Sequence, residues 1–136
     1  MPLVDKEDPP LEEIRAGWKK PIRELAAFSA KHDKPILFTE VGYKSTKDSG
    51  IEPWTWPERR MDSNSRSQIY SAETQANLYQ ALFLEVWDEP WLAGFHFWKW
   101  YPQKPKLNTA NNSTNIDFTP QNKPVEDLIR AQYSAR

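Results

Sequence analysis

Apolar positions recur at intervals of three and four residues in three segments of the chain. This spacing predicts amphipathic helices over residues 11–32, 72–87 and 125–133. In the first of these, Pro21 interrupts the apolar face, so we expect the helix to kink or restart there. Asp8 and Ser71 precede the first and second helices, where their side chains are placed to cap the helix N-termini.

Shorter apolar runs that lack helical spacing predict β-strands over residues 35–40 and 92–99. The first run, with Ile36, Leu37 and Phe38 in succession, is typical of a parallel strand that is buried on both faces. The polar segments between these elements, residues 42–70 and 102–123, predict long irregular loops. The order helix, strand, loop, helix, strand, loop, helix is that of repeating βα units in an α/β fold.

The length of the chain limits how much of such a fold it can form. A complete eight-stranded β/α barrel needs about 250 residues, whereas this chain has 136. We therefore predict an α/β fold that is a partial (β/α)8 barrel, with residues 1–136 forming a single C-terminal portion of one domain. A partial barrel leaves sheet edges open, so self-association through these edges is expected.

Composition argues against several classes of function. The formal charge of −1 gives no reason to expect nucleic acid or an anionic membrane as a partner. The absence of cysteine excludes disulfides and thiolate metal sites. No apolar run is long enough for a membrane helix. Residues 1–10 do not read as a signal peptide, which leaves the compartment open, including a secreted or periplasmic parent protein.

Glu40 is the strongest candidate for chemistry. It follows the apolar run within KPILFTEVGYKS (34–45), and Gly42 comes two residues later. Ligands bind at the carboxyl ends of strands in parallel α/β folds, and a buried carboxylate without a partner costs several kcal/mol. Glu40 is therefore either a functional acid or one half of a salt bridge to a lysine or arginine on a neighbouring strand.

Alternation divides the side chains of the second strand between two faces. One face would carry Phe95, Phe97 and Lys99, and the other would carry His96, Trp98 and Trp100. A tryptophan offers a flat apolar face on which a sugar ring can stack, and its indole N–H can donate to a hydroxyl. Trp98 is the better candidate for such a platform, with Trp100 towards a rim; core packing is the alternative for both.

Three further aromatic residues are candidate ligand contacts. Trp54 and Trp56, in the first long loop, are either outer sugar platforms or hydrophobic anchors of that loop. Tyr43 either points its hydroxyl back over the strand end or packs the loop. His96 is interpreted as a hydrogen-bonded residue inside the barrel, because no second histidine lies at metal-ligand spacing.

These segments resemble one known family. The stretches PILFTEVGYKS, QANLYQALFLEVW, LAGFHFWKW and DFTPQNKPVEDLIRAQY are together similar to the C-terminal half of glycoside hydrolase family 113. The resemblance implies a (β/α)8 barrel, of which this chain would hold strands seven and eight with their flanking helices. It also implies retaining hydrolysis of a β-linked polysaccharide, mannan-like in composition, without a metal or organic cofactor.

The resemblance assigns roles by position. Glu40 would be the nucleophile and Trp98 the platform beneath the sugar being cleaved, with Tyr43, Lys99 and Trp100 as neighbours. The family's acid/base is a glutamate that follows an asparagine, and no Asn-Glu pair occurs in this chain. Retaining hydrolysis needs two carboxyl groups about 5–5.5 Å apart, so the acid/base would lie outside this chain, and the isolated chain would be inactive.

Two other classes of function stay open. The chain could be a non-catalytic carbohydrate-binding module that uses the surface tryptophans Trp54, Trp56, Trp98 and Trp100. In that case a Glu40→Gln variant would still bind saccharide. It could also be a scaffold or interaction domain whose aromatic residues are all core. In that case its tryptophan fluorescence would not change when oligosaccharides are added. The sequence does not identify the sugar, its linkage, or endo or exo action.

Overall fold

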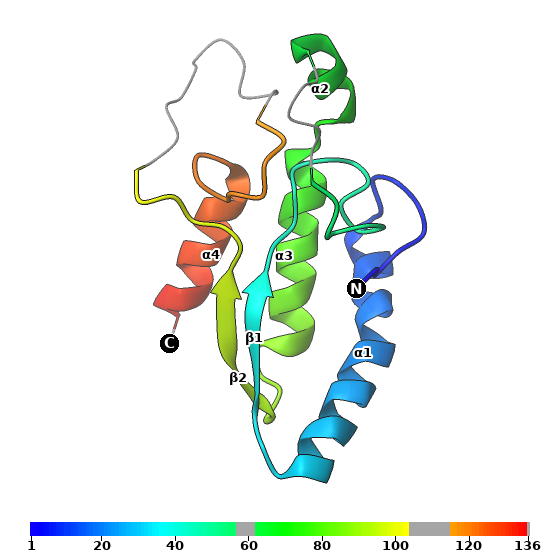
Figure 1. Ribbon diagram of the computed structural model, residues 1–136, viewed down its shortest axis with the longest axis vertical. Coiled ribbons are helices and arrows are strands. Elements are labelled where there is room, and N and C mark those ends of the chain that lie inside the picture. The colour runs from blue at the N-terminus through cyan, green and yellow to red at the C-terminus, as the bar shows by residue number, and fades with distance from the viewer. Residues whose placement is uncertain (57–61, 104–114, 136) are drawn as a thin grey trace.

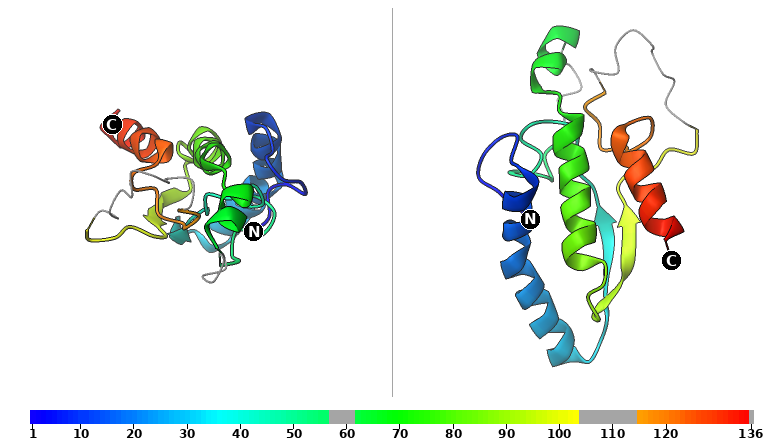
Figure 2. Two further views of the ribbon diagram at one scale, coloured as in Figure 1. Left: turned by 90° about the horizontal axis from the view of Figure 1, so that it is seen from above. Right: turned by 180° about the vertical axis from the view of Figure 1, so that it is seen from behind.

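The computed structural model describes residues 1–56, 62–103 and 115–135, so parts of both predicted loops lie outside the described residues. Three long helices pack on one face of a two-stranded sheet (Figures 1 and 2). The elements are α1 (Leu11–His32), β1 (Ile36–Val41), α2 (Ser63–Ile69), α3 (Ala72–Val86), β2 (Leu92–Phe97) and α4 (Pro124–Ser134). Their order confirms the α/β prediction. Among the described residues, no helix is both long and apolar enough to cross a membrane.

Of the two predicted helix N-caps, one is confirmed and the other is wrong. Ser71 caps α3 as predicted, because its hydroxyl accepts a hydrogen bond from the Thr74 amide at 3.2 Å. The prediction for Asp8 is wrong: Pro10 is the N-cap of α1, and the Asp8 carboxylate instead accepts from the Thr74 hydroxyl at 2.7 Å. Asp8 thus joins the N-terminal segment to α3 rather than starting its own helix.

One of the two expectations for Pro21, a kink or a restart, is excluded, and a loop prediction is corrected. Helix α1 does not restart at Pro21, which lies buried within one continuous element. The polar run of residues 62–68, predicted as loop, forms the short helix α2. Asp62 caps α2 by accepting from the Ser65 amide at 2.8 Å. The run has no apolar periodicity, so the pattern that predicted the other helices gave no signal for this one.

Strands β1 and β2 pair in parallel, as predicted, with α2 and α3 in the crossover between them. The expectation that β1 is buried on both faces is wrong. Phe38 and Val41 pack towards the helices, but Leu37 is 47% exposed and Thr39 is also exposed. All three long helices lie on one side of the sheet, so the other face meets solvent (Figure 2).

Helix α3 is the centre of the core and contacts both α1 and α4. Its residues Leu78, Tyr79 and Leu82 are fully buried. Phe83 places its ring against the rings of Phe95 and Phe97 and so attaches α3 to β2. An ion pair between Arg15 and Glu85, with 2.5 Å between the two charged groups, links α1 to α3 at the half-exposed margin.

Truncation in the core and truncation on the exposed face of the sheet should have different costs. We expect Leu82→Ala to lower the free energy of unfolding by about 2–5 kcal/mol, because it empties a buried site. The matched change Leu37→Ala, on the exposed face, should cost less than about 1 kcal/mol. Urea unfolding of both variants measures the difference, and equal losses would show that the exposed face is covered in solution.

Candidate active site

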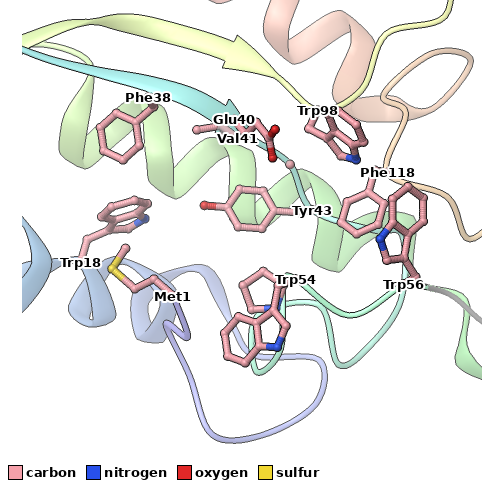
Figure 3. Close-up of a pocket in the computed structure, with 12 residues that line it drawn as sticks. Met1, Trp18, Phe38, Glu40, Val41, Tyr43, Trp54, Trp56, Trp98 and Phe118 are labelled. Carbon is pink, nitrogen blue, oxygen red and sulfur yellow. The ribbon is translucent and has the colours of Figure 1, made fainter.

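A pocket of about 390 Å³ lies at the carboxyl ends of the two strands (Figure 3), a size within the range of small-molecule sites. Five of the six predicted site residues line it: Glu40, Tyr43, Trp54, Trp56 and Trp98. Met1, Trp18, Phe38 and Phe118 contribute to the same wall. Trp100, the sixth, is 48% exposed and is not part of the lining.

An irregularity in β1 leaves the Glu40 side chain exposed at the strand end. Phe38 pairs with Phe95 and Val41 pairs with Phe97, so three steps along β1 match two steps along β2. Because both Phe38 and Val41 face the helices, the extra residue leaves Glu40 exposed, with its carboxylate in the pocket (Figure 3). Bulges of this kind redirect side chains next to functional sites. Simple alternation from Phe38 would instead have directed Glu40 towards the helices.

The ends of the two strands are held in direct contact. The Trp98 amide donates to the Val41 carbonyl at 2.6 Å. A Cβ atom at Gly42 would lie 1.9 Å from the Trp98 carbonyl oxygen, so only glycine fits at this position. The following peptide bond, Trp98–Lys99, is cis. Glu40 and Trp98 are therefore brought to one pocket by their own backbones.

Lys44 forms the polar contacts that hold the turn carrying Trp54 and Trp56. The Lys44 side chain is buried, with its ammonium group 2.9 Å from the Asp48 carboxylate. The same group donates to the Thr55 hydroxyl at 2.6 Å. Thr55 separates the two tryptophans, so this bond fixes both of them relative to the strand end. The sequence analysis missed Lys44, whose signal is a lysine four residues before an aspartate.

Gln75 is a second residue that supports the pocket and that the sequence analysis missed. Its buried amide donates to the Tyr43 carbonyl at 2.7 Å and to the Phe118 carbonyl at 3.1 Å. Tyr43 and Phe118 belong to different loops, and both line the pocket. Gln75 therefore joins the two loops from α3. The available signal was a polar residue on the face that α3 buries with Leu78 and Leu82.

The side chains of Tyr43 and Trp98 are placed differently. Tyr43 is only 6% exposed and packs edge-on against Tyr79, with ring centroids 5.2 Å apart. Burial raises the pKa of the Tyr43 hydroxyl well above its usual value. Trp98 is 38% exposed, which leaves part of its indole surface accessible from the pocket. Of the two, Trp98 has the surface that stacking requires.

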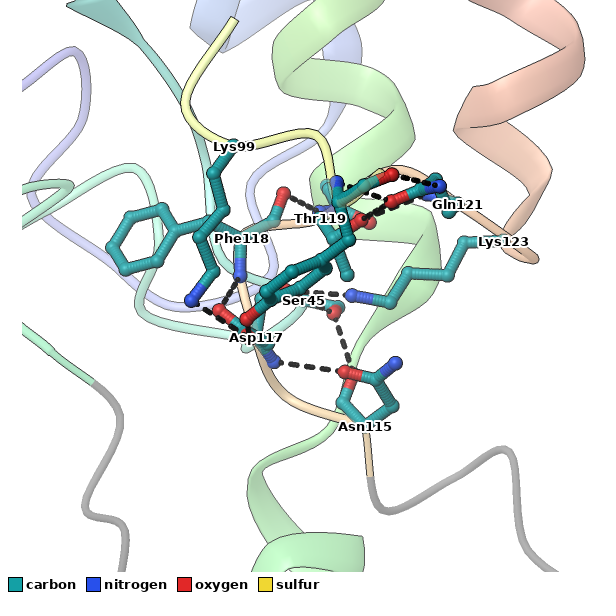
Figure 4. Close-up of polar contacts among 10 residues, drawn as sticks. Ser45, Lys99, Asn115, Asp117, Phe118, Thr119, Gln121 and Lys123 are labelled. Atoms are coloured by element: carbon teal, nitrogen blue, oxygen red, sulfur yellow. Dashed lines mark hydrogen bonds and ion pairs between the residues drawn. The ribbon is translucent and has the colours of Figure 1, made fainter. Parts of the chain in front are cut away.

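A polar cluster supports the wall formed by Phe118 (Figure 4). Lys123 is 7% exposed and donates to the Asp117 backbone carbonyl at 2.6 Å. Burial lowers the pKa of Lys123 to about 7; the positive charge of Lys99 adds to this effect, and Asp117 opposes it. Burial alone would raise the pKa of Asp117, but hydrogen bonds from Tyr101 and Lys99 lower it.

The described residues place one carboxylate in the lining of the pocket, that of Glu40. The salt bridge considered for Glu40 is absent from the ion pairs of the described residues. These residues also hold no cluster of three or more histidine, aspartate or glutamate side chains suited to a metal. His96 is exposed on the open face of β2. The described residues supply two strands and no closed barrel, so the placement of His96 inside a barrel stays a prediction.

Gly42→Ala should separate the strand ends. The added methyl group would overlap the carbonyl oxygen of Trp98, whose amide bonds to Val41, so relief of the overlap would disturb the contact between the strand ends. We expect a loss of stability of about 1–3 kcal/mol, with a change in the near-ultraviolet circular dichroism of the tryptophans. Thr39→Ala, an exposed position in the same strand, is the control. A stable Gly42→Ala variant with an unchanged spectrum would contradict this close approach.

Lys123 should make stability depend on pH. The folded protein releases the Lys123 proton near pH 7, whereas the unfolded chain keeps it to about 10.5. Between these values the unfolded state binds more protons, so the free energy of unfolding should rise with pH, by at most about 1.4 kcal/mol per unit. Burial also raises the pKa of Tyr43 and Tyr79, so the comparison is made below pH 10.

The measurement is urea unfolding of the unaltered chain and of Lys123→Met between pH 7 and pH 9.5. The variant should lack the part of the slope that Lys123 supplies. Identical slopes in the two proteins would show that Lys123 stays charged in the folded state.

A family model and the solved structures that resemble this chain indicate the same family. A family model described as Glycoside Hydrolase Family 113 matches residues 7–123. Comparison with curated proteins gives no match. Among solved structures, the family 113 β-mannanase AaManA from Alicyclobacillus acidocaldarius, in complex with ManMIm, is 28% identical, with a TM-score of 0.70 over 90% of this chain and 36% of its own.

Two further solved structures agree. One, a complex of a GH113 β-1,4-mannanase, is 25% identical, with a TM-score of 0.68, over 88% of this chain and 35% of its own. The other, a structure of a GH113 β-1,4-mannanase, is 25% identical, with a TM-score of 0.70, over 90% of this chain and 36% of its own. The chain thus spans about a third of the length of these relatives, and its α/β fold is similar to theirs. Because the family model covers most of its residues, this chain belongs to glycoside hydrolase family 113.

Proposed function

We propose that this chain carries the nucleophile side of the active site of a retaining glycoside hydrolase that acts on β-linked mannan. In this proposal β1 and β2 are the seventh and eighth strands of a (β/α)8 barrel. One observation carries it: Glu40, at the end of β1, lines the same pocket as Trp98, at the end of β2. The carboxyl ends of barrel strands are where such enzymes place their catalytic groups.

In the proposed reaction, the Glu40 carboxylate attacks the anomeric carbon of the sugar, and the bond from that carbon to the glycosidic oxygen breaks. The leaving oxygen takes a proton from a second carboxyl group, which later removes a proton from water as the glycosyl-enzyme is hydrolysed. The exposed position of Glu40 suits the first step, because its oxygens are accessible from the pocket.

The second carboxyl group would come from outside this chain. Among the described residues, Glu40 is the only acidic side chain that lines the pocket, and a retaining site needs two carboxyls about 5–5.5 Å apart. The isolated chain would therefore bind saccharide weakly and would not hydrolyse mannan. Mannan is proposed as the substrate because the three solved relatives described above are β-mannanases.

Trp98 would hold the sugar that is cleaved. Its partly exposed indole lies beside Glu40 in the pocket (Figure 3). A pyranose stacked on the indole would present its anomeric carbon to the carboxylate. The alternative of a binding module is favoured by the three tryptophans that line the pocket, Trp54, Trp56 and Trp98. That function would not need Glu40.

A fluorinated β-mannobioside with a dinitrophenolate leaving group tests the role of Glu40. Dinitrophenolate leaves without protonation, so a nucleophile can be trapped even when the acid lies outside the chain. We expect slow addition of one fluorinated mannobiosyl group, found by peptide mass spectrometry on Glu40. Glu40→Gln should not react, whereas Glu73→Gln, an exposed control on α3, should react normally.

The outcomes separate the two functions. Labelling of Glu40 supports the hydrolase. An unlabelled chain that still binds mannotetraose, equally well as the Glu40→Gln variant, would favour the binding module. Labelling on a different residue would overturn the assignment of Glu40.

A further inference from the structure

We propose that Lys99 is a positioning residue that fixes Trp56 as a second wall of the sugar site, at right angles to Trp98. This inference rests on the proposed function for its ligand, a β-linked mannooligosaccharide. It adds a role for Lys99, and it makes Trp56 a contact to the edge of the same sugar ring that stacks on Trp98.

The first observation is the arrangement of the two indoles. The rings of Trp56 and Trp98 have centroids 6.2 Å apart and planes at 85°. Trp56 also meets Phe118 at 5.5 Å and 71°. Trp56 is 50% exposed and lines the pocket with Trp98. Because the two indoles are nearly perpendicular, a sugar ring stacked flat on Trp98 would direct its rim towards Trp56. The substituents that distinguish one hexose from another lie on that rim.

The second observation is what holds Trp56 in this place. The Lys99 ammonium lies 5.1 Å from the centre of the Trp56 ring and 4.7 Å from the centre of the Tyr101 ring. Both distances are within the range of a cation–π interaction. Lys99 is the residue directly after Trp98, so it connects the end of β2 to a tryptophan that the chain places after β1.

The third observation is that Lys99 is itself held in place. Its ammonium group is 3.1 Å from the Asp117 carboxylate. Asp117 accepts further hydrogen bonds from the Tyr101 hydroxyl at 2.7 Å and from the Phe118 amide at 2.7 Å. Figure 4 shows Lys99 beside Asp117 and Phe118. The cation is thus fixed by a partly buried acid, and its position does not depend on the ring that it contacts.

Several contacts hold Trp56. Lys44 bonds to the adjacent Thr55, and Phe118 and Lys99 contact the indole itself. Loss of Lys99 would leave the bond to Thr55 in place and remove one of the contacts that fix the indole. A purely structural role would instead lower stability without a specific effect on Trp56.

The first arm of the test is fluorine NMR of the chain labelled with fluorotryptophan, with the Trp56 resonance assigned from Trp56→Leu. We expect Lys99→Met, which keeps the length of the side chain without the charge, to shift and broaden the Trp56 resonance. Lys99→Arg should restore it. Lys19→Met, which removes an exposed charge on α1, is the matched control. An unchanged Trp56 resonance in Lys99→Met would overturn the positioning role.

The second arm is titration with mannotetraose in a double-mutant cycle. We expect Lys99→Met and Trp56→Leu each to weaken binding by about three- to tenfold, and the double variant to be no weaker than Trp56→Leu. Additive losses would overturn the inference, because Lys99 would then act independently of Trp56. If the unaltered chain binds no mannotetraose, the proposed function and the sugar wall both fail. If it binds and Lys99→Met binds equally well, the inference alone fails.

Discussion

The contact between the carboxyl ends of β1 and β2 is the constraint on which the site depends. The Trp98 amide bonds to the Val41 carbonyl, and Gly42 lies against the Trp98 carbonyl oxygen, where no side chain fits. The backbones therefore meet at one point, and the residues on either side of it are forced into one pocket. The bulge in β1 then decides which way Glu40 points. Glu40 and Trp98 are neighbours because of backbone geometry, and they would remain so without any bond between their side chains.

Buried polar groups help to position the loops around this point, in addition to the hydrophobic packing of Tyr43 and Phe118. Gln75 reaches from α3 to the carbonyls of Tyr43 and Phe118, and Lys44 reaches to Thr55. Burial of such groups is costly unless they are paired, so each bond fixes its loop in one position. A catalytic site needs this kind of support, because a small displacement of a platform or nucleophile has a large effect on rate.

Local sequence patterns predicted most helices and strands, but they predicted less well what covers these elements and which residues they contact. The elements other than α2, the parallel pairing and the cap at Ser71 follow from periodicity and residue type. The burial of β1 on both faces was wrongly predicted, because an apolar run does not reveal how many strands and helices are present to cover it. Asp8 was misassigned because its partner, Thr74, is 66 residues away in the sequence.

The same difference between local pattern and long-range contact separates the site residues that could be predicted from those that could not. Glu40 and Trp98 could be placed together because strand ends share one edge of a parallel sheet. The bonds of Gln75 and the contact of Lys99 with Trp56 could not be predicted, since each joins segments whose separation depends on the fold. The bond from Lys44 to Thr55 could not either, because it depends on how one long loop turns back on itself. A lysine beside a tryptophan in WKW carries no signal that its cation will lie over a different indole.

Under the proposed function, the exposure of Glu40 has an electrostatic consequence. A lone carboxylate at the mouth of a pocket is hydrated and needs no counter-charge, which agrees with its lack of an ion pair among those of the described residues. A second carboxyl about 5–5.5 Å away, as retaining hydrolysis requires, would lie close to that charge and would supply the proton that the leaving oxygen needs. In the proposal, this chain supplies the nucleophile and its platform, and the acid comes from outside the chain.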